Sequence, residues 1–292
     1  MSAQPGRPQV VATDLDGTLL RPDGSVSPYT QGVLRRLDDA GVRVVFVTAR
    51  PPRWLGELAG LAGSHGTAIC MNGAAVYDFA TTTMTDVRGF ATTDLGALVA
   101  DLRAAIPGVA LAVERLDGPV YDPGFATDHP VPADLRRVAV EATLSDDPAH
   151  AVGKLLAVLP GTEPLEFFAQ VRRVVGPRAV LAYSGAVGLA EMTAPTVTKA
   201  AALERWCAVH GVDAGDVWAF GDMPNDLPML RWAGHGVAVS NAHPDVLDAV
   251  DAVTGPNDED GVARHLELLL RPGDTAGTGL ARARRGSAGP RT

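Results

Sequence analysis

Short, continuously apolar segments alternate with helical patterns in both the first and the last part of the chain. Residues 9–13 form one such segment, and residues 42–47 and the tetrapeptide TAIC form the next two. Toward the C-terminus, residues 216–220 and 236–240 repeat the arrangement. Unbroken apolar runs of this length are typical of strands buried on both faces of a parallel sheet. The alternation predicts an α/β fold with a doubly wound, Rossmann-like parallel sheet and right-handed crossovers.

The helix expected after the first strand has recognisable ends. Ser27 and Pro28 match the N-cap and first helical positions, and Gly41 matches the residue that follows a helix. The preceding stretch LLRPDGSVS contains a PDG turn between two short extended pieces, which predicts a small hairpin. Further helices are expected around PRWLGELAGL, at roughly 198–210, at NDLPMLRWA and around GVARHLELLL.

The middle of the chain has a different pattern. Alternating stretches such as TMTDVRGF, ALAVERL and RRVAVEATL are separated by helical patterns at 94–106, 148–158 and 164–174. This mixture predicts an α+β domain inserted into the parallel-sheet core. The expected parts are a discontinuous core of residues 1–80 and 190–272, an inserted domain of residues 81–189, and a disordered Arg/Gly-rich tail of residues 273–292.

Composition is that of an ordinary globular protein, with 46% hydrophobic and 20% charged residues. No stretch near the N-terminus resembles a signal peptide, and no apolar run approaches the roughly 18 residues of a membrane span. Two cysteines, Cys70 and Cys207, cannot form a disulfide framework. We therefore expect a cytoplasmic protein without a membrane partner.

Charge is unevenly distributed along the chain. The net charge of the chain is −9. Residues 277–292 contain four arginines and no acid and so carry +4, which leaves −13 on residues 1–276. An acidic body argues against nucleic acid as a partner, because a phosphate backbone is bound by a basic surface.

Polar residues follow three of the expected strands, at the point where each strand ends. Asp14, Thr48 and Asp222 should therefore meet at the carboxyl edge of the sheet, where open α/β sheets bind ligands. Asp14 and Asp16 face the same side if the strand continues, and two such charges about 4 Å apart repel by about 4 kcal/mol at an effective dielectric constant of 20. A divalent cation would offset this repulsion, and oxygen ligands favour Mg²⁺ over Zn²⁺.

Two further features have both a structural and a functional interpretation. Asn225 and Asp226, in GDMPND, could cap a helix or contribute to an anion site at its N-terminus. Lys199 begins a helix and is one of only two lysines in the chain. It could be a surface residue, or a compact cation for a phosphate oxygen.

Paired aspartates such as those of DLDGT also occur in unrelated kinds of site. An EF-hand is excluded, because the twelfth loop position is Ser25 instead of Glu and a strand precedes the loop. A DxD site of a nucleotide-sugar transferase accommodates Asp14 and Asp16 but does not require Thr48 or Lys199. A glycosidase acid pair is disfavoured, because its two carboxyl groups stand at least about 5 Å apart on separate elements, whereas Asp14 and Asp16 are two residues apart. A capped polar turn would suffice for DLDGT alone.

Taken together, the motifs resemble those of the haloacid dehalogenase superfamily. DLDGT, Thr48, Lys199 and GDMPND occur in the order of its four motifs, and the match is closer to the Cof-like phosphatases, which carry a large α/β cap inserted after the third core strand. VVFVTAR, NGAAV, APTVTKAAAL, GVAVSNAHPDV and NDEDGVA extend the resemblance over nearly the whole core. Ala49 departs from the Gly that commonly follows the motif-two threonine.

The resemblance implies a Mg²⁺-dependent phosphatase that forms an aspartyl-phosphate on Asp14. It implies that Asp14, the Asp16 carbonyl and Asp222 hold the metal, and that the Asp16 side chain serves as general acid and then base. Aspartate at position 16, where the related P-type ATPases have threonine, favours rapid hydrolysis. Phosphate oxygens would be bound by Thr48, Lys199, Asn225 and backbone N–H groups around Ala49, while Asp226 would orient the metal site or Lys199.

Other properties remain open at this level. Arg50 is expected either to touch the leaving group or to pair with an acid. The substrate is expected to be a small phosphorylated metabolite, with a sugar phosphate favoured, and the protein a monomer or weak homo-oligomer. A phosphomutase and a catalytically silent relative are the alternatives. Candidate cap contacts to the leaving group are Glu114, Arg115, Tyr121, Tyr183 and Glu191.

Overall fold

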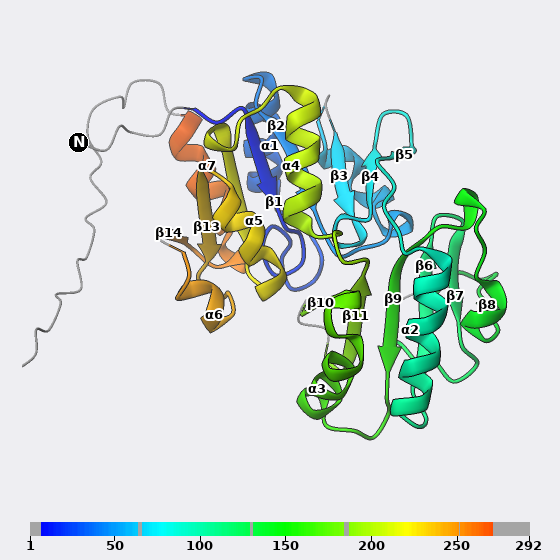
Figure 1. The fold of residues 1–292 in the computed structure, drawn as a ribbon. Helices are drawn as coiled ribbons and strands as arrows, with labels where there is room; N and C mark the ends of the chain where they lie inside the picture. The colour runs from blue at the N-terminus through cyan, green and yellow to red at the C-terminus, as the bar shows by residue number, and fades with distance from the viewer. Residues whose placement is uncertain (1–6, 64–65, 129–130, 184–186, 251, 271–292) are drawn as a thin grey trace, which may run out of the picture.

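The structure is a computed structural model, in which residues 7–63, 66–128, 131–183, 187–250 and 252–270 are described. The Arg/Gly-rich tail expected over residues 273–292 lies outside the described residues. In the described part, the strands form two separate sheets. Figure 1 shows the larger sheet at the upper left and the second sheet at the lower right.

The larger sheet contains the predicted doubly wound core. Its strands are β1 (Val10–Thr13), β2 (Arg43–Val47), β3 (Thr67–Cys70), β4 (Ala75–Asp78), β5 (Thr83–Thr85), β12 (Val217–Gly221), β13 (His235–Val239) and β14 (Ala252–Thr254). The order is β14-β13-β12-β1-β2-β3-β4-β5. Pairing is parallel from β14 to β3, and β4 and β5 add an antiparallel edge. The α/β fold class is confirmed.

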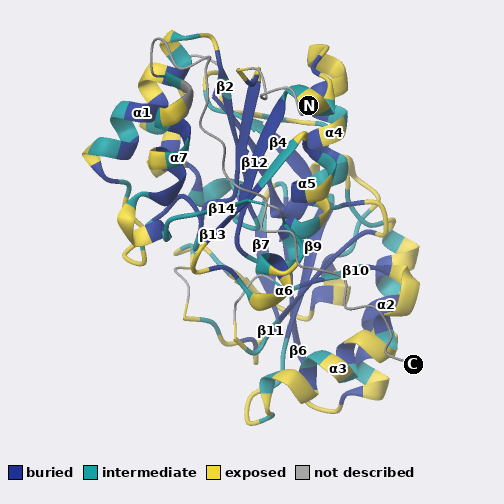
Figure 2. Cartoon of the chain, turned by 90° about the vertical axis from the view of Figure 1, so that its left-hand side faces the viewer, coloured by how far each residue is buried: buried dark blue, intermediate teal, exposed yellow. Residues whose placement is uncertain are grey.

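Helices cover both faces of this sheet. They are α1 (Pro28–Asp39), α4 (Lys199–His210), α5 (Leu227–Trp232), α6 (Pro244–Leu247) and α7 (Gly261–Leu270). Figure 2 shows α1 and α7 on one side of the buried strands and α4 and α5 on the other. The start of α1 agrees with its predicted signals: the Ser27 hydroxyl accepts a hydrogen bond from Thr30 N at 3.0 Å, and Pro28 is the first helical residue. None of the helices in the described ranges is long and apolar enough to cross a membrane.

Among the described residues, the second sheet has helices on one face only. Its strands are β6 (Ala110–Arg115), β7 (Gly118–Tyr121), β8 (Arg136–Arg137), β9 (Val152–Val158), β10 (Val180–Ala182) and β11 (Leu189–Thr193), in the order β10-β11-β9-β6-β7-β8. The helices α2 (Thr92–Ala105) and α3 (Pro164–Val175) pack against side chains such as Val113 and Leu155. Because side chains alternate along a strand, Glu114, Lys154 and Leu156 lie on the opposite, helix-free face.

The prediction of a helix at 148–158 is wrong. Residues Pro148–His150 form a short 3-10 turn, and Val152–Val158 is the strand β9, paired with β6 and β11. A short apolar run cannot be assigned to helix or strand by periodicity alone. Here both flanking strands supply the backbone partners. The one charge in the run, Lys154, is buried and held by hydrogen bonds.

Three other local predictions also need correction. PRWLGELAGL forms two 3-10 helices, Pro52–Trp54 and Gly56–Leu61, because its two glycines disfavour a regular α-helix. In LLRPDGSVS the turn forms, with Gly24 N donating to Arg21 O at 2.8 Å, but no hairpin strands flank it. RRVAVEATL contains only the two-residue β8 and a 3-10 turn. Asp122 accepts a hydrogen bond from Val140 N and so takes up that backbone donor. The 3-10 helices not yet named are Met71–Gly73, Val140–Thr143, Gly176–Arg178, Ala214–Asp216, Pro224–Asp226 and Asn257–Glu259.

Candidate active site

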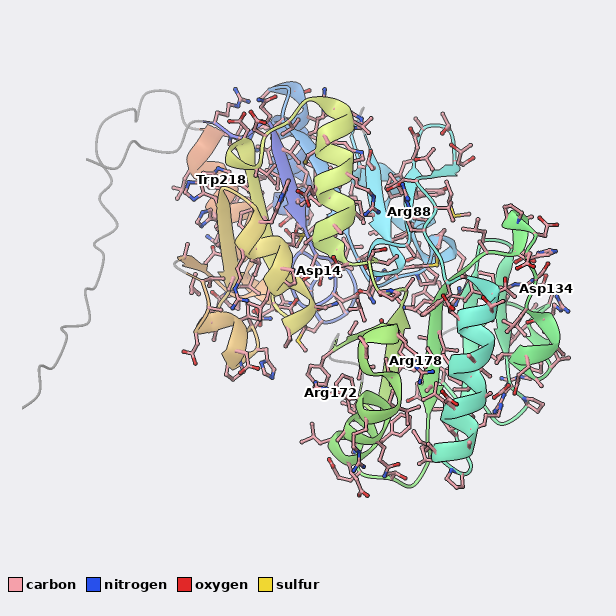
Figure 3. The ribbon with its side chains drawn as sticks, in the orientation of Figure 1. Asp14, Arg88, Asp134, Arg172, Arg178 and Trp218 are labelled. Atoms are coloured by element: carbon pink, nitrogen blue, oxygen red, sulfur yellow. The ribbon has the colours of Figure 1, made fainter. Side chains whose placement is uncertain are left out.

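Asp14 and Asp222 lie side by side at the carboxyl edge of the larger sheet. They follow the neighbouring parallel strands β1 and β12, and Asp14 N donates to Phe220 O at 3.0 Å. From β1 the chain continues to β2 on one side, whereas β12 lies on the other. This is a topological switch point, where open α/β sheets bind ligands. Figure 3 places Asp14 at the lower end of the larger sheet, on the side that faces the second sheet.

Lys199 joins two of the aspartates. It is the first residue of α4, and its Nζ donates to Asp14 Oδ1 and to Asp226 Oδ1, each at 2.7 Å. All three side chains are buried, with 8% of the Asp14 side chain, 2% of Lys199 and none of Asp226 exposed. A lysine so enclosed is a structural cation between carboxylates, not a surface residue. The first-turn surface interpretation of Lys199 is therefore excluded.

Both carboxylate oxygens of Asp226 accept hydrogen bonds from neighbouring groups. Its Oδ2 accepts hydrogen bonds from the backbone N–H groups of Asp222 and Met223, at 3.1 and 3.0 Å, while Oδ1 accepts from Lys199. Gly221 makes this turn possible, since a Cβ at that position would lie 2.5 Å from Asp226 Cβ. Asp226 therefore shapes the loop GDMPND and places Lys199.

The carboxylates of Asp14 and Asp222 are poised for a cation. Burial raises the pKa of Asp14 well above its usual value; Lys199 lowers it in part, and Asp226 and Asp222 raise it further. Burial likewise raises the pKa of Asp222 to about 6, although the Thr18 hydroxyl, which donates to Asp222 Oδ1 at 2.6 Å, opposes the shift. Two buried, like-charged groups that resist ionisation in this way are stabilised by a bound cation.

The donor set fits Mg²⁺. Within the described residues, Asp14, Asp222 and Asp226 each offer a carboxylate oxygen within 4.8 Å of the others. Both oxygens of Asp226 are already hydrogen-bonded, so Asp14 and Asp222 are the better ligands of the three. Gly17 lines the same place, because a Cβ there would lie 2.4 Å from Asp222 Oδ2. A small site with only hard oxygen donors suits Mg²⁺ with retained waters.

Asp16 is paired with an arginine. Arg50 donates from Nη2 to Asp16 Oδ1 at 2.6 Å and from Nε to Asp16 Oδ2 at 2.8 Å. The Asp16 side chain is 59% exposed, in contrast to Asp14. In the structure Arg50 therefore pairs with an acid, Asp16, and it also lines the cavity described below.

Thr48 and Asn225 reach the site from two different loops. Thr48 is buried after β2, and its Oγ1 accepts from Arg50 N at 3.0 Å, which leaves its own hydroxyl hydrogen available to a ligand. Asn225 Nδ2 donates to Asn72 Oδ1 at 3.2 Å. Asn225 Oδ1 is buried and has no hydrogen-bond partner among the described residues. An unsatisfied buried acceptor beside the aspartates indicates a ligand or water position.

A cavity of about 260 Å³ lies between these groups and the helix-free face of the second sheet. Of the predicted site residues, Asp14, Asp16, Ala49, Arg50, Lys199 and Asn225 line it. Thr48, Asp222 and Asp226 lie behind this lining. The opposite wall contains Glu114, Tyr121, Lys154, Leu156, Leu189 and Glu191. The rest of the lining is Pro51, Trp54, Phe125, Thr127 and Met223.

Three of the five proposed leaving-group contacts face this cavity, namely Glu114, Tyr121 and Glu191. The other two do not line it. Arg115 is paired with Asp117, and Tyr183 packs edge-on against Phe168, with ring centroids 5.5 Å apart.

Lys154 and Asn72 belong to the site, although they were not among the residues predicted for it. Lys154 lies within residues 148–158, for which the sequence pattern predicts a helix. The feature of the sequence that could have indicated Lys154 is the rarity of lysine: the chain has only two, and both line this cavity.

Comparison with known proteins agrees with this geometry. A family model described as haloacid dehalogenase-like hydrolase matches residues 11–266. A protein named HMP-PP phosphatase from Serratia proteamaculans is 30% identical over 277 residues, covering 90% of this chain and 96% of that protein. The pyridoxal phosphate phosphatase YbhA from Escherichia coli is 27% identical, with 88% and 97% covered. The solved structure of a haloalkanoate-superfamily phosphatase from Bacteroides thetaiotaomicron has a TM-score of 0.76 at 23% identity, covering 90% of this chain and 95% of that one.

The chain belongs to the haloacid dehalogenase-like hydrolase family. The resemblance drawn from its four motifs to the Cof-like branch is confirmed, and so is the class of enzyme, a phosphatase of this superfamily.

Proposed function

We propose that this protein is a Mg²⁺-dependent phosphatase that hydrolyses small phosphate monoesters through an aspartyl-phosphate on Asp14. The observation that carries the proposal is the buried group of Asp14, Lys199 and Asp222 at a switch point, beside a small cavity of about 260 Å³. The names of two relatives support it, since one is an HMP-PP phosphatase and the other a pyridoxal phosphate phosphatase. A sugar phosphate remains within the same substrate class.

Asp14, Asp222 and the backbone carbonyl of Asp16 would hold the metal. When bound, Mg²⁺ would reduce the repulsion between the Asp14 carboxylate and a phosphate dianion and would neutralise charge that develops on the phosphoryl oxygens.

Asp14 is the nucleophile in this proposal. Lys199 holds Oδ1, which fixes the carboxylate and leaves Oδ2 to attack phosphorus as the ester P–O bond breaks. The Thr48 hydroxyl, Lys199 and backbone N–H groups near Ala49 would hold the phosphate oxygens and stabilise their charge.

Asp16 would transfer the protons. Both of its oxygens accept hydrogen bonds from Arg50, so it can protonate the departing alkoxide only once it is released from this pair. Its exposure permits that movement. The same carboxylate, once it has given up its proton, would remove a proton from the water that attacks phosphorus and regenerates Asp14.

Asp16→Asn is expected to lower kcat/KM by about 100-fold or more for benzyl phosphate, but by less than about tenfold for p-nitrophenyl phosphate, because only the poor leaving group needs a proton. Steady-state kinetics with both esters measures this difference. Equal losses for the two esters would show that Asp16 is not the general acid.

Asp222→Asn is expected to raise the Mg²⁺ concentration for half-activation by about tenfold or more, because one of two carboxylate ligands loses its charge. The rise in Tm on adding Mg²⁺ should shrink in parallel, which gives a readout independent of turnover. Thr18→Val is the matched control, since it removes only the hydrogen bond to Asp222 and should have a smaller effect. Unchanged Mg²⁺ affinity in Asp222→Asn would contradict the assigned ligand set.

A panel of phosphate esters, assayed with and without Mg²⁺, tests the function itself. The panel contains sugar phosphates, pyridoxine 5′-phosphate, benzyl phosphate and p-nitrophenyl phosphate. Phosphate release that depends on Mg²⁺ supports the proposal. Turnover that appears only when an acceptor sugar or a bisphosphate is added would indicate a phosphomutase or phosphotransferase instead. No turnover under any condition would indicate a silent binding relative.

A further inference from the structure

Lys154 is a buried cation on the wall of the cavity opposite Asp14. It lies in the central strand β9 and is only 4% exposed. Its Nζ donates to Ala49 O at 2.9 Å and to Glu191 Oε2 at 3.2 Å. An ammonium group has three N–H bonds, and the described residues accept only these two. One donor of Lys154 thus remains for a molecule in the cavity, which Lys154 lines.

A chain of hydrogen bonds connects Lys154 to residues of the larger sheet. Asn72 donates from Nδ2 to Glu191 Oε2 at 2.8 Å, and its Oδ1 accepts from Asn225. Asn72 has a left-handed backbone, with φ of 58°, a conformation that asparagine tolerates better than most residues. The chain Asn225–Asn72–Glu191–Lys154 therefore ties the second sheet to the loop that carries Asp222.

Several apolar and aromatic side chains line the cavity together with Lys154. Leu156, Leu189, Trp54, Tyr121 and Phe125 line the same cavity. Three of these are aromatic, in a chain with only 15 aromatic residues. The third N–H of Lys154 can donate to a ligand, and a hydrogen bond from a charged donor is stronger than one between neutral groups.

Lys154 also lies on the leaving-group side of the reaction. The residues assigned to the phosphate, Thr48 and Lys199, lie at the carboxyl edge of the larger sheet, whereas Lys154 extends from β9 of the second sheet on the opposite wall of the cavity. A group bound by Lys154 therefore belongs to the alcohol that leaves, not to the phosphate that stays.

We propose that Lys154 determines substrate choice by binding a hydrogen-bond acceptor on the leaving alcohol. The inference rests on the proposed phosphatase function. The substrate class is the monophosphate of a small alcohol that has an apolar or flat body against the aromatic wall and an oxygen, ring nitrogen or negative charge directed at Lys154. A cavity of about 260 Å³ restricts this alcohol to a small molecule.

Lys154→Met tests the proposal through a ratio of specificities. The numerator is kcat/KM for pyridoxine 5′-phosphate or glucose 6-phosphate, whichever the unaltered enzyme hydrolyses better. Both of these esters carry acceptors. The denominator is kcat/KM for benzyl phosphate, whose leaving alcohol has no second polar group. The variant is expected to lower this ratio by about 10- to 100-fold, the usual effect of losing a hydrogen bond from a charged group.

Arg205→Met is the matched control. Arg205 lies in α4 and donates from Nε to Asp86 Oδ2 at 2.8 Å, so it also joins a helix of the larger sheet to the chain that leads to the second sheet, but neither residue lines the cavity. Losing this contact should lower kcat/KM for both esters by the same factor. If Lys154→Met also lowers both equally, or leaves the ratio unchanged, Lys154 is only a structural contact or a phosphate ligand, and the proposal is overturned.

The inhibition constant of inorganic phosphate separates these two results further. It should not change in Lys154→Met if the lysine binds the leaving group, and it should rise if the lysine binds phosphate. Failure of the proposed phosphatase function would be a different result: the unaltered enzyme would hydrolyse none of the three esters.

Discussion

Replacing Asp14 by Asn is expected to reduce kcat by roughly 10⁴- to 10⁶-fold for every phosphate ester, the range seen when an enzyme loses its nucleophile. The amide nitrogen and oxygen of Asn cannot attack phosphorus as a carboxylate does. The fold should persist, because Lys199 keeps its hydrogen bond to Asp226. The measurement is kcat with the best ester of the panel, at saturating Mg²⁺.

Asp216→Asn is the control for this experiment. Asp216 precedes β12, at the end of that strand remote from Asp222, and its Oδ2 accepts a hydrogen bond from the Gln9 side chain. Its substitution should leave turnover within about twofold, as surface changes usually do. Near-normal turnover in Asp14→Asn, with contaminating phosphatases excluded, would disprove the assigned nucleophile.

Lys199→Met is expected to affect both stability and activity. It leaves two buried carboxylates, Asp14 and Asp226, without their shared cation, and breaking a buried ion pair costs about 3–5 kcal/mol. Because Lys199 lowers the pKa of Asp14, its loss also favours the neutral, non-nucleophilic acid. We expect kcat to fall by at least about 100-fold. Urea unfolding without Mg²⁺ and steady-state kinetics with Mg²⁺ measure the two effects.

A second substitution separates the two roles of Lys199. In Lys199→Met/Asp226→Asn one unpaired charge is removed, so part of the lost free energy of unfolding should return. Activity should remain low, since the cation beside Asp14 is still missing. A destabilisation below about 1 kcal/mol in the single variant would contradict the view that Lys199 offsets buried charge.

The residues at strand ends were predictable because a parallel sheet places them together. Asp14, Thr48 and Asp222 follow β1, β2 and β12, and these strands are neighbours in the structure. Lys199 is the first residue of a predicted helix, and the start of that helix lies at the same edge of the sheet. From charge, the sequence predicts a cation beside the adjacent carboxylates of Asp14 and Asp16, whereas the phosphatase chemistry is implied only by the resemblance of the four motifs.

On the opposite wall of the cavity, Glu114, Tyr121 and Glu191 are among the expected leaving-group contacts, whereas Lys154 was not predictable, for definite physical reasons. The segment around Lys154 is equally compatible with helix and strand, and its pairing with β6 and β11 decides the matter. The partner of Arg50 depends on a side-chain geometry that no spacing specifies. The left-handed backbone of Asn72, which aims its amide at Glu191, is likewise set by tertiary contacts.

The proposed mechanism is tested most sharply by trapping phosphate on Asp14. Asp16→Asn should still accept phosphate from p-nitrophenyl phosphate but should release it slowly, because the proposed base for the attacking water is lost. Acid quenching during turnover with radiolabelled ester, followed by peptide mapping, locates the label. The mechanism predicts a hydroxylamine-sensitive phosphate on the peptide that contains Asp14, absent when Asp14 is also replaced by Asn. Turnover without any protein-bound phosphate, or a label on another residue, would contradict it.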